Sequence, residues 1–285
     1  MLGFINVYKP SGMTSSDVVV KLRRKFHIDR IGHMGTLDPM ASGVLPIAVG
    51  KATRMFDYFL DKYKTYVAEF KFGYETDTLD SEGVETSTCS KIPSEGELIT
   101  AINSFVGEYD QIPPKFSAKS VNGVKAYKLA RSGTEVELKA KRVDIKRLSL
   151  LSYCDGVCKL EIVCSSGTYI RALGRDIAYK MNTLATMISL TRTQSGVFDI
   201  DRAVSLDELL NVATIESYLY GIINVFPKMQ VVCLSDKDTF RIRNGIKIDN
   251  VYGVDRCCFI TNNDELICVA ENVDNKLKIK TYLVE

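Results

Sequence analysis

The chain contains few of the side chains that usually bind metals. Its only histidines are His27 and His33, and its eight cysteines include no pair separated by two residues. Structural zinc sites depend on such spacing, so the sequence argues against one. We therefore expect no metal, and we interpret the cysteines as reduced residues, mostly of the core.

Long apolar runs and a secretion signal are also missing. No segment approaches the roughly 18 apolar residues of a membrane helix, and residues 1–9 lack a basic region followed by an apolar one. The 285 residues, 46% hydrophobic and 25% charged, fit a globular protein with a sizeable core. We expect a cytoplasmic protein with one large domain, or with a main domain and a small appendage.

The net charge of +2 says little about partners, because charge is unevenly distributed. Residues 119–147 contain nine Lys or Arg and three acidic residues. Such an excess could follow a phosphate backbone, or it could be a solvated face. From charge alone both interpretations stay open.

Residues 30–46 combine three glycines, two prolines, one histidine and a single carboxylate, Asp38. No helical or strand period runs through them, so they are expected to form a shaped loop. Asp38 followed by Pro39 could cap a helix, because Pro is favoured at the first helical position. A catalytic carboxylate is the alternative.

The positions of charged residues predict two further features. A cation at the start of a helix is unfavourable for the helix dipole, so Arg171 needs a carboxylate partner, for which we choose Asp38. The acidic run at 76–83 is expected to be a hydrogen-bonded turn rather than a metal site.

Periodicity and capping residues predict the helices and strands. We expect strands at 3–8, 64–72, 136–153 and 157–164. We expect helices after Thr14 and Ser94 and at 172–181, 205–212 and 215–222.

Several motifs together resemble one known family. The run Gly32-His33-x-Gly35-Thr36-Leu37-Asp38-Pro39-x-Ala41-Ser42-Gly43-Val44-Leu45 is similar to the signature of the TruB family of tRNA pseudouridine synthases. Matching segments also occur at residues 9–15, 64–66, 76–78, 121–133, 167–171 and 188–196. The resemblance therefore extends along most of the chain.

This resemblance implies roles for individual residues around one extruded uracil. Asp38 would be the nucleophile, steered by Arg171, and Tyr66 would stack on the base and help to remove its C5 proton. The other implied base-binding residues are His33, which fills the space left in the RNA, Tyr169, which braces the ion pair from beneath, and Leu190, which packs against the base. No cofactor is implied, because the reaction retains all substrate atoms.

RNA contacts are expected mainly from the basic segment, in which aromatic residues are interspersed. The motif at 9–15 is expected to shape the cradle beneath the loop, and Lys9 within it is also a candidate RNA ligand. The complete set of RNA-binding candidates is Lys9, Lys119, Lys125, Lys128 and Arg131.

The implied fold is α+β, with a pseudouridine-synthase catalytic domain at 1–228 built on a mixed, largely antiparallel sheet. It would carry an RNA-binding insertion at 107–147 and be followed by a small PUA-like β-barrel at 229–285. The implied substrate is uridine 55 of the tRNA T-arm. A monomer without an obligatory protein partner or membrane is expected. A non-catalytic tRNA-binding or folding module and a guide-RNA-dependent relative are the alternatives.

Overall fold

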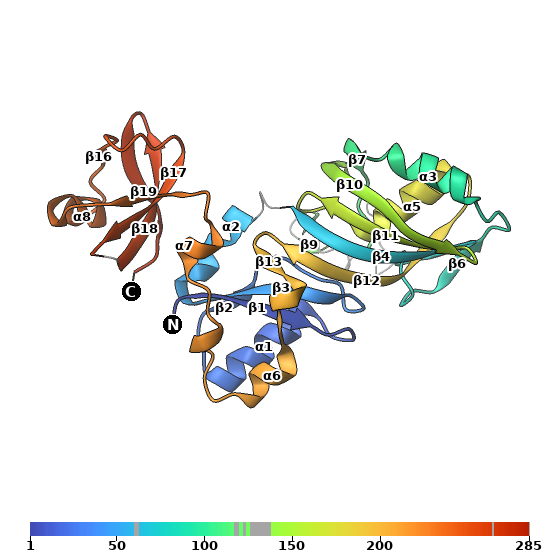
Figure 1. Cartoon of the computed structure of the whole chain (residues 1–285), viewed down its shortest axis with the longest axis horizontal. Helices are drawn as coiled ribbons and strands as arrows, with labels where there is room; N and C mark the ends of the chain where they lie inside the picture. The colour runs from blue at the N-terminus through green and yellow to red at the C-terminus, as the bar shows by residue number, and fades with distance from the viewer. Residues whose placement is uncertain (60–62, 117–119, 122–123, 126–137, 264, 285) are drawn as a thin grey trace.

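The computed structural model describes residues 1–59, 63–116, 120–121, 124–125, 138–263 and 265–284. A large sheet with helices on it fills the centre and right of Figure 1, and a smaller sheet near the C-terminus lies at the left. No helix in these ranges is long and apolar enough to cross a membrane.

The large sheet is mixed and mostly antiparallel, as predicted. The pairs β1 with β14 and β3 with β12 are parallel, whereas the other neighbours are antiparallel. In spatial order its main path is β14 (Val204–Ser205), β1 (Gly3–Lys9), β3 (Ser42–Val49), β12 (Ala185–Ser195), β4 (Lys64–Phe72), β11 (Val157–Cys164), β10 (Lys141–Cys154) and β7 (Gly107–Gln111). Off this path, β2 (Ile31–His33) pairs with β3, and β13 (Phe198–Asp199) pairs with β12.

Helices cover this sheet in two groups (Figure 1). The helices α1 (Ser15–Phe26) and α6 (Leu206–Asn211) lie near the β1 end. The helix α5 (Ile170–Lys180) packs on β12 and β4, and α3 (Glu95–Asn103) packs on α5 and β10. The smaller elements are η1 (Gly50–Met55), α2 (Phe56–Phe59), β5 (Tyr74–Thr76), β6 (Glu85–Thr88), β8 (Ser120–Val121), β9 (Val124–Lys125), η2 (Ile200–Arg202), η3 (Glu216–Tyr218) and α7 (Ile222–Val225).

Local sequence signals account for many element boundaries. Thr14 and Asp17 form a reciprocal capping box at α1, and Ser94 and Glu97 form one at α3. The predicted hairpin between β10 and β11 turns at residues 155–156, both of which have positive φ. These predictions are confirmed.

The helix predicted at 215–222 is wrong. A short 3-10 turn, η3, occupies residues 216–218, and α7 begins only at Ile222. The intervening backbone instead pairs with the first strand, where Phe4 and Tyr220 exchange N–H to O hydrogen bonds of 3.0 and 2.7 Å. Pairing at the sheet edge thus outweighs the helical propensity of this segment.

The segment at 30–46 is a loop only in its middle. Its ends belong to β2 and β3, and β3 lies between β1 and β12. Gly43 makes this position possible, because it has φ +103° and a Cβ there would lie 2.3 Å from the Arg192 carbonyl oxygen. The proposed helix cap is also wrong, because the chain turns after Asp38 and continues into β3.

The C-terminal strands occur where the apolar runs predict them: β17 (Cys257–Asn262), β18 (Glu265–Val273) and β19 (Lys276–Tyr282). Together with β15 (Gln230–Cys233) and β16 (Ile248–Asp249) they form a sheet of order β15-β17-β18-β19-β16, beside which lies α8 (Asp236–Arg243). No pairing joins β15 to β16 in the described ranges, so the sheet is a half-barrel rather than a closed barrel. The predicted division at 228/229 stays a prediction.

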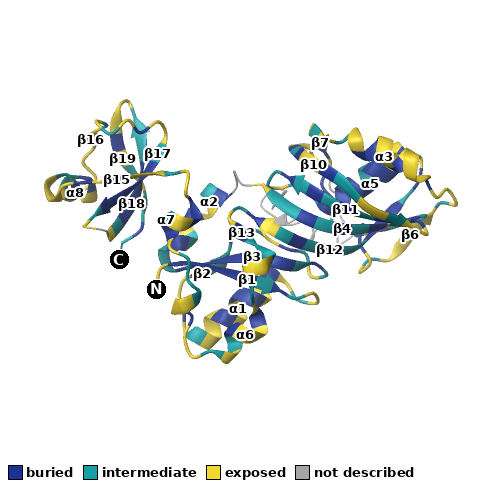
Figure 2. Cartoon of the chain, viewed as in Figure 1, coloured by how far each residue is buried: buried dark blue, intermediate teal, exposed yellow. Residues whose placement is uncertain are grey.

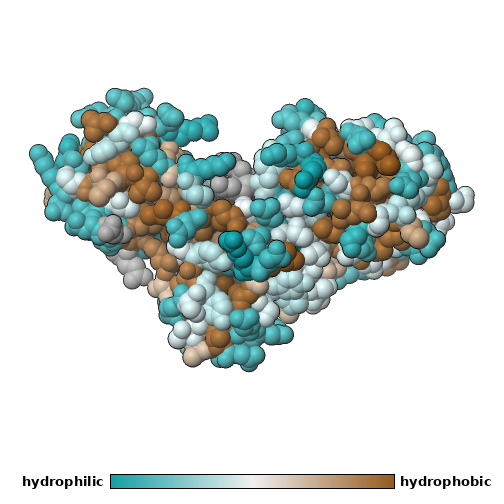
Figure 3. All heavy atoms as spheres, viewed as in Figure 1, coloured by the Kyte–Doolittle hydropathy of each residue, from teal (hydrophilic) through white to brown (hydrophobic). Residues whose placement is uncertain are grey.

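One apolar cluster joins the two sheets. Phe259, Val269 and Leu283 of the C-terminal sheet belong to the same buried cluster as Phe4 and Phe226. Figure 2 shows buried residues along the strands of both sheets, and Figure 3 shows a notch between the two lobes above this junction. The C-terminal sheet is therefore packed against the remainder rather than tethered to it.

The contact between α5 and the large sheet depends on a missing side chain. A Cβ on Gly174 would lie 2.1 Å from a ring carbon of the buried Phe70. We expect Gly174→Ala to lower the free energy of unfolding by about 1–3 kcal/mol, as overpacking does, and to lower the urea midpoint.

The matched control is Gly96→Ala in α3, where no atom lies within 4 Å of the added Cβ. It should leave stability unchanged or raise it by up to about 1 kcal/mol. Equal midpoints for Gly174→Ala and the unmodified protein would contradict this packing argument.

Candidate active site

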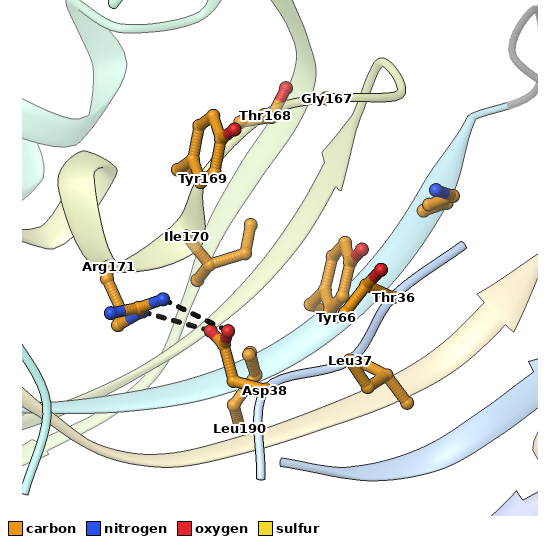
Figure 4. Close-up of a pocket in the computed structure, with 11 residues that line it drawn as sticks. Thr36, Leu37, Asp38, Tyr66, Gly167, Thr168, Tyr169, Ile170, Arg171 and Leu190 are labelled. Atoms are coloured by element: carbon orange, nitrogen blue, oxygen red, sulfur yellow. Dashed lines mark hydrogen bonds and ion pairs between the residues drawn. The ribbon is translucent and has the colours of Figure 1, made fainter. Parts of the chain in front are cut away.

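Asp38 and Arg171 meet in a two-pronged ion pair. Arg171 Nε donates to Asp38 Oδ2 at 2.9 Å, and its Nη2 donates to Asp38 Oδ1 at 3.0 Å (Figure 4). The fork of the guanidinium fixes the plane of the carboxylate. The pairing predicted from the helix position of Arg171 is therefore present.

The remaining donors of Arg171 hold it in place. Its Nη1 donates to the Thr78 carbonyl at 2.8 Å and lies 3.4 Å from Asp80 Oδ2, and its Nη2 also donates to the Phe116 carbonyl at 3.1 Å. The side chains of Arg171 and Asp80 are 7% and 6% exposed, whereas that of Asp38 is 32% exposed. Of these three side chains, only that of Asp38 is therefore accessible to a ligand.

A cavity of about 210 Å³ lies beside this pair. The cavity has room for a flat ring of the size of a nucleobase. Its walls come from the central loop, the start of β4, the turn before α5 and β12, and the lining residues are Thr36, Leu37, Asp38, Lys64, Tyr66, Gly167, Thr168, Tyr169, Ile170, Arg171 and Leu190. Four predicted site residues besides Asp38 thus share this cavity: Tyr66, Tyr169, Arg171 and Leu190.

The motif at 9–15 forms the cradle of the loop, as predicted. Ser15 Oγ donates to the Leu37 carbonyl at 3.1 Å and accepts from the Leu37 N–H at 2.8 Å. Lys9 Nζ donates to the carbonyls of Pro10, Met13 and Pro39 at 2.9, 2.6 and 3.2 Å.

Lys9 is therefore not a surface cation for RNA. It is 0% exposed, and its ammonium donors are already used by backbone carbonyls. The expectation that Lys9 contacts RNA is wrong, because carbonyls of the turn and of the loop bind this lysine inside the fold.

Arg192 supports the same loop from the other side. It is fully buried, and its Nε, Nη1 and Nη2 donate to the carbonyls of Val44, Thr36 and Gly35 at 2.7, 3.4 and 3.1 Å. The loop that presents Asp38 is thus held by one cation on each side, Lys9 and Arg192.

Tyr66 is buried in the cavity wall. Burial raises the pKa of its phenol, while the nearby Arg192, which also hydrogen-bonds to it, acts to lower that pKa. The net pKa is raised, so the hydroxyl is protonated at neutral pH. Arg192 is the charged neighbour that a tyrosine needs if it is to accept a proton.

His33 ends β2, just before the loop, and is not among the residues that line the cavity. Burial lowers its pKa, and the positive charges of Arg192 and Lys64 lower it further, so the imidazole is neutral at pH 7. Its Nδ1 is buried and has no hydrogen-bond partner in the described part of the chain.

Tyr169 is positioned by an amide clamp. The Tyr169 N–H donates to Gln111 Oε1 at 2.8 Å, and Gln111 Nε2 donates back to the Tyr169 carbonyl at 3.1 Å. Figure 4 shows Ile170 between the Tyr169 ring and Asp38, so Tyr169 flanks the ion pair across the cavity instead of lying directly beneath it.

The other predicted RNA ligands cannot be placed. Lys119, Lys128 and Arg131 lie outside the described residues, as does most of the segment at 117–137. Lys125 belongs to the short strand β9. Their proposed contacts with RNA stay predictions.

Sequence reasoning missed three contributors to the site: Asp80, Gln111 and Arg192. Asp80 lies in the acidic run at 76–83, which forms the predicted hydrogen-bonded turn, with Thr78 Oγ1 donating to Asp80 Oδ1 at 2.6 Å. No group of three or more metal-binding side chains occurs in the described ranges. A buried arginine in need of a second anion was the signal that could have identified Asp80.

A carboxylate steered by arginine beside a ring-sized cavity with an aromatic wall is suited to covalent attack on a flat heterocycle. The fold matches that of Cbf5 in a crystal structure of a Cbf5-Nop10-Gar1 complex, with TM-score 0.76 and 23% identity over 99% of this chain and 85% of that one. An H/ACA ribonucleoprotein bound to a substrate RNA containing 2′-deoxyuridine matches with TM-score 0.74 and 21% identity over 99% of this chain and 85% of that one. The chain thus has the fold that these two structures contain.

Sequence comparison identifies the family to which the chain belongs. Residues 23–170 match the TruB family pseudouridylate synthase N-terminal domain, and residues 171–224 match the tRNA pseudouridylate synthase B C-terminal domain. The tRNA pseudouridine synthase B of Clostridium perfringens (strain 13 / Type A) is 40% identical over 251 residues, covering 87% of this chain and 85% of that protein. That of Clostridium tetani is 36% identical over 291 residues, covering all of both chains. The chain belongs to the TruB family of tRNA pseudouridine synthases.

The geometry of the fork predicts the effect of a charge-conserving substitution. Arg171→Lys retains a positive charge but loses the paired hydrogen bonds that orient Asp38, so we expect kcat to fall about 100-fold while RNA affinity changes little. Arg147→Lys makes the same exchange in an exposed ion pair with Glu161 and should leave kcat unchanged. A kcat for Arg171→Lys close to that of the unmodified protein, measured under single-turnover conditions, would contradict an orienting role.

Proposed function

We propose that this protein isomerises uridine 55 in the T-arm of tRNA to pseudouridine, using Asp38 as its catalytic carboxylate. The observation that carries the proposal is the forked Asp38–Arg171 pair at the wall of a ring-sized cavity. The names of the TruB relatives support tRNA as the substrate.

The target base must leave the folded RNA loop to reach this cavity. In this proposal the uracil stacks on Tyr66 and packs against Leu190, both of which are buried in the cavity wall. The neutral imidazole of His33 fills the space that the base leaves in the RNA. Tyr169 bounds the cavity on the far side of Ile170.

The reaction then moves a bond without adding or removing atoms overall. The Asp38 carboxylate attacks and bonds to the substrate, the bond between uracil N1 and ribose C1′ breaks, and the base turns. C5 then bonds to C1′, and the bond to Asp38 breaks and returns the free carboxylate. C5 then loses its proton and N1 gains one. Attack at C1′, attack at C6 and an eliminative route all use the same carboxylate, and the retained atoms require no cofactor or energy source.

Tyr66 is our candidate for the group that accepts the C5 proton. Its phenol is protonated at neutral pH in the free protein, so proton transfer requires stabilisation of a developing phenolate. The buried guanidinium of Arg192, close enough to lower the pKa of Tyr66, would supply that stabilisation.

The same proposal covers the parts of the chain that bind the rest of the RNA. The basic segment at 119–147 would contact the T-arm backbone, and the C-terminal half-barrel would act as a PUA-like RNA-binding appendage. The enzyme would work as a monomer without a guide RNA or protein partner. A tRNA-binding or folding module without catalysis is the alternative, but binding alone does not need an oriented carboxylate.

The decisive test uses purified protein alone and a tRNA transcript tritiated at uridine C5. We expect tritium release and a single pseudouridine at position 55, mapped by carbodiimide treatment and primer extension. Asp38→Asn should lower release at least about 1000-fold, because the neutral amide is a poor nucleophile. Asp57→Asn, an exposed site on α2, is the control and should not change it.

Three outcomes of this assay would count against the proposal. No release by the unmodified protein would favour the binding module, and release restored by adding a guide RNA would favour a guide-dependent enzyme. Undiminished tritium release by Asp38→Asn would show that Asp38 is not the catalytic carboxylate, although the protein would still have the proposed activity.

A separate substitution tests the proton acceptor. Tyr66→Phe keeps the ring for stacking and removes the hydroxyl, so RNA affinity should be retained while tritium release slows by about 100-fold or more, the usual contribution of a general base. Tyr66→Leu should additionally weaken binding of the base. Equal release rates for Tyr66→Phe and the unmodified protein would show that another group takes the proton.

A further inference from the structure

One cation at the cavity has no counter-ion among the residues that the structure describes. Lys64 opens β4 and lines the cavity, and its ammonium has no hydrogen bond or ion pair with any residue in the described part of the chain. Lys9, in contrast, donates to three carbonyls and lies near Asp38. The two lysines flank one loop, but of the two only Lys64 has donors that no described residue uses.

The charges around Lys64 are of the same sign. A Cβ on Gly35 would lie 3.0 Å from Lys64 Nζ and 3.7 Å from Arg192 Nη1, so both cations converge on the bare backbone of this glycine. Lys141 approaches from β10, where its ammonium lies over Gly167 and donates to the Ser166 carbonyl at 3.4 Å. The nearby thiol of Cys164 carries no negative charge, because burial raises its pKa to about 11.

This arrangement is unfavourable for the isolated protein. Burial and the repulsion of Arg192 lower the pKa of Lys64 to about 8. A partly buried ammonium without an anion is destabilising unless a ligand provides the opposite charge. The protein thus carries at its cavity a positive charge that nothing in the described chain neutralises.

We propose that Lys64 binds a backbone phosphate of the RNA directly adjacent to the nucleotide whose base enters the cavity. This inference rests on the proposed function and adds a contact to it. When the base occupies the cavity and its ribose lies at Asp38, as the proposed function requires, the two flanking phosphates lie at the rim of the cavity. A lysine presents a compact point charge with rotatable donors, which suits one phosphate oxygen in a site of this size.

Gly35 has a defined part in this contact. It lies two residues before Leu37, in the loop that presents Asp38, and its lack of a side chain leaves room for both cations. The phosphate on Lys64 would therefore be held against the same loop as the catalytic carboxylate. Phosphate binding and base placement would share one rigid support.

The experiment pairs a protein substitution with a chemical change in the RNA. T-arm stem-loops are made with a single uncharged methylphosphonate at the phosphate 5′ or 3′ of the target uridine, and their affinities are measured for the unmodified protein, Lys64→Gln and Lys64→Arg. Lys71→Gln is the matched control, because Lys71 lies on the same strand but is exposed on its opposite face.

We expect the methylphosphonate at one of the two positions to weaken binding to the unmodified protein about tenfold, as loss of one charged contact does. Lys64→Gln should bind the ordinary RNA about tenfold more weakly and lose nothing further with that methylphosphonate. For Lys64→Gln, the slope of log affinity against log salt concentration should be shallower by about 0.7–0.9 than for the unmodified protein. Lys64→Arg should retain most of the affinity, and Lys71→Gln should match the unmodified protein.

The pH dependence gives a second readout. The phosphate binds the protonated amine, so the contribution of Lys64 is fully present below pH 8 and is lost as pH rises above the pKa of about 8 in the free protein. Lys64→Arg should keep its affinity constant between about pH 7 and 9, because arginine stays charged. Equal pH profiles for the two proteins would contradict the proposed contact.

The outcomes separate this inference from the proposed function. The phosphate contact is wrong if the affinity losses from Lys64→Gln and from the methylphosphonate multiply at both positions. It is also wrong if Lys64→Gln binds like the unmodified protein. In either case tritium release by the unmodified protein persists. If the unmodified protein releases no tritium, the proposed function fails first. Thermal melting of Lys64→Gln and Lys64→Arg distinguishes a lost contact from a lost fold.

Discussion

The structure of the site depends on one guanidinium whose hydrogen-bonding capacity is fully used. Arg171 has five N–H donors, and they face both oxygens of Asp38, the carbonyls of Thr78 and Phe116, and the carboxylate of Asp80. A buried cation between two carboxylates has its desolvation offset by both. Asp38, the exposed member, is consequently fixed in orientation while remaining free to meet a ligand.

The features that the sequence predicts well are those that depend on neighbours in the chain. Alternation gives β4, the capping boxes give the starts of α1 and α3, and residues 155–156 give the turn between β10 and β11. The pairing of Arg171 with Asp38 was also predictable, because a cation at a helix start needs an anion. The family signature supplied the remaining assignments, including the shared cavity of Tyr66 and Leu190.

What the sequence does not reveal depends on contacts between distant segments. Lys9 reads as a surface cation, yet its ammonium is held by carbonyls up to 30 positions away. Residues 42–49 become a strand only because β1 and β12 lie on either side of them. Asp80 and Arg192 have no periodic or capping signal, since each is defined by what it neutralises or supports across the fold. The predicted C-terminal barrel is an open half-barrel in the described residues. Sequence could not show this difference, because closure depends on pairing between the first and last strands.

The chain that leads toward the basic segment is tied to α5 at three successive points. Gln111 clamps the backbone of Tyr169, Arg175 donates to the Ile112 carbonyl at 2.9 Å, and Arg171 donates to the Phe116 carbonyl. Displacement of residues 112–116 would therefore withdraw an acceptor from the same guanidinium that aims Asp38. The position of residues 112–116 and the orientation of the Asp38 carboxylate are thus coupled through the side chain of Arg171.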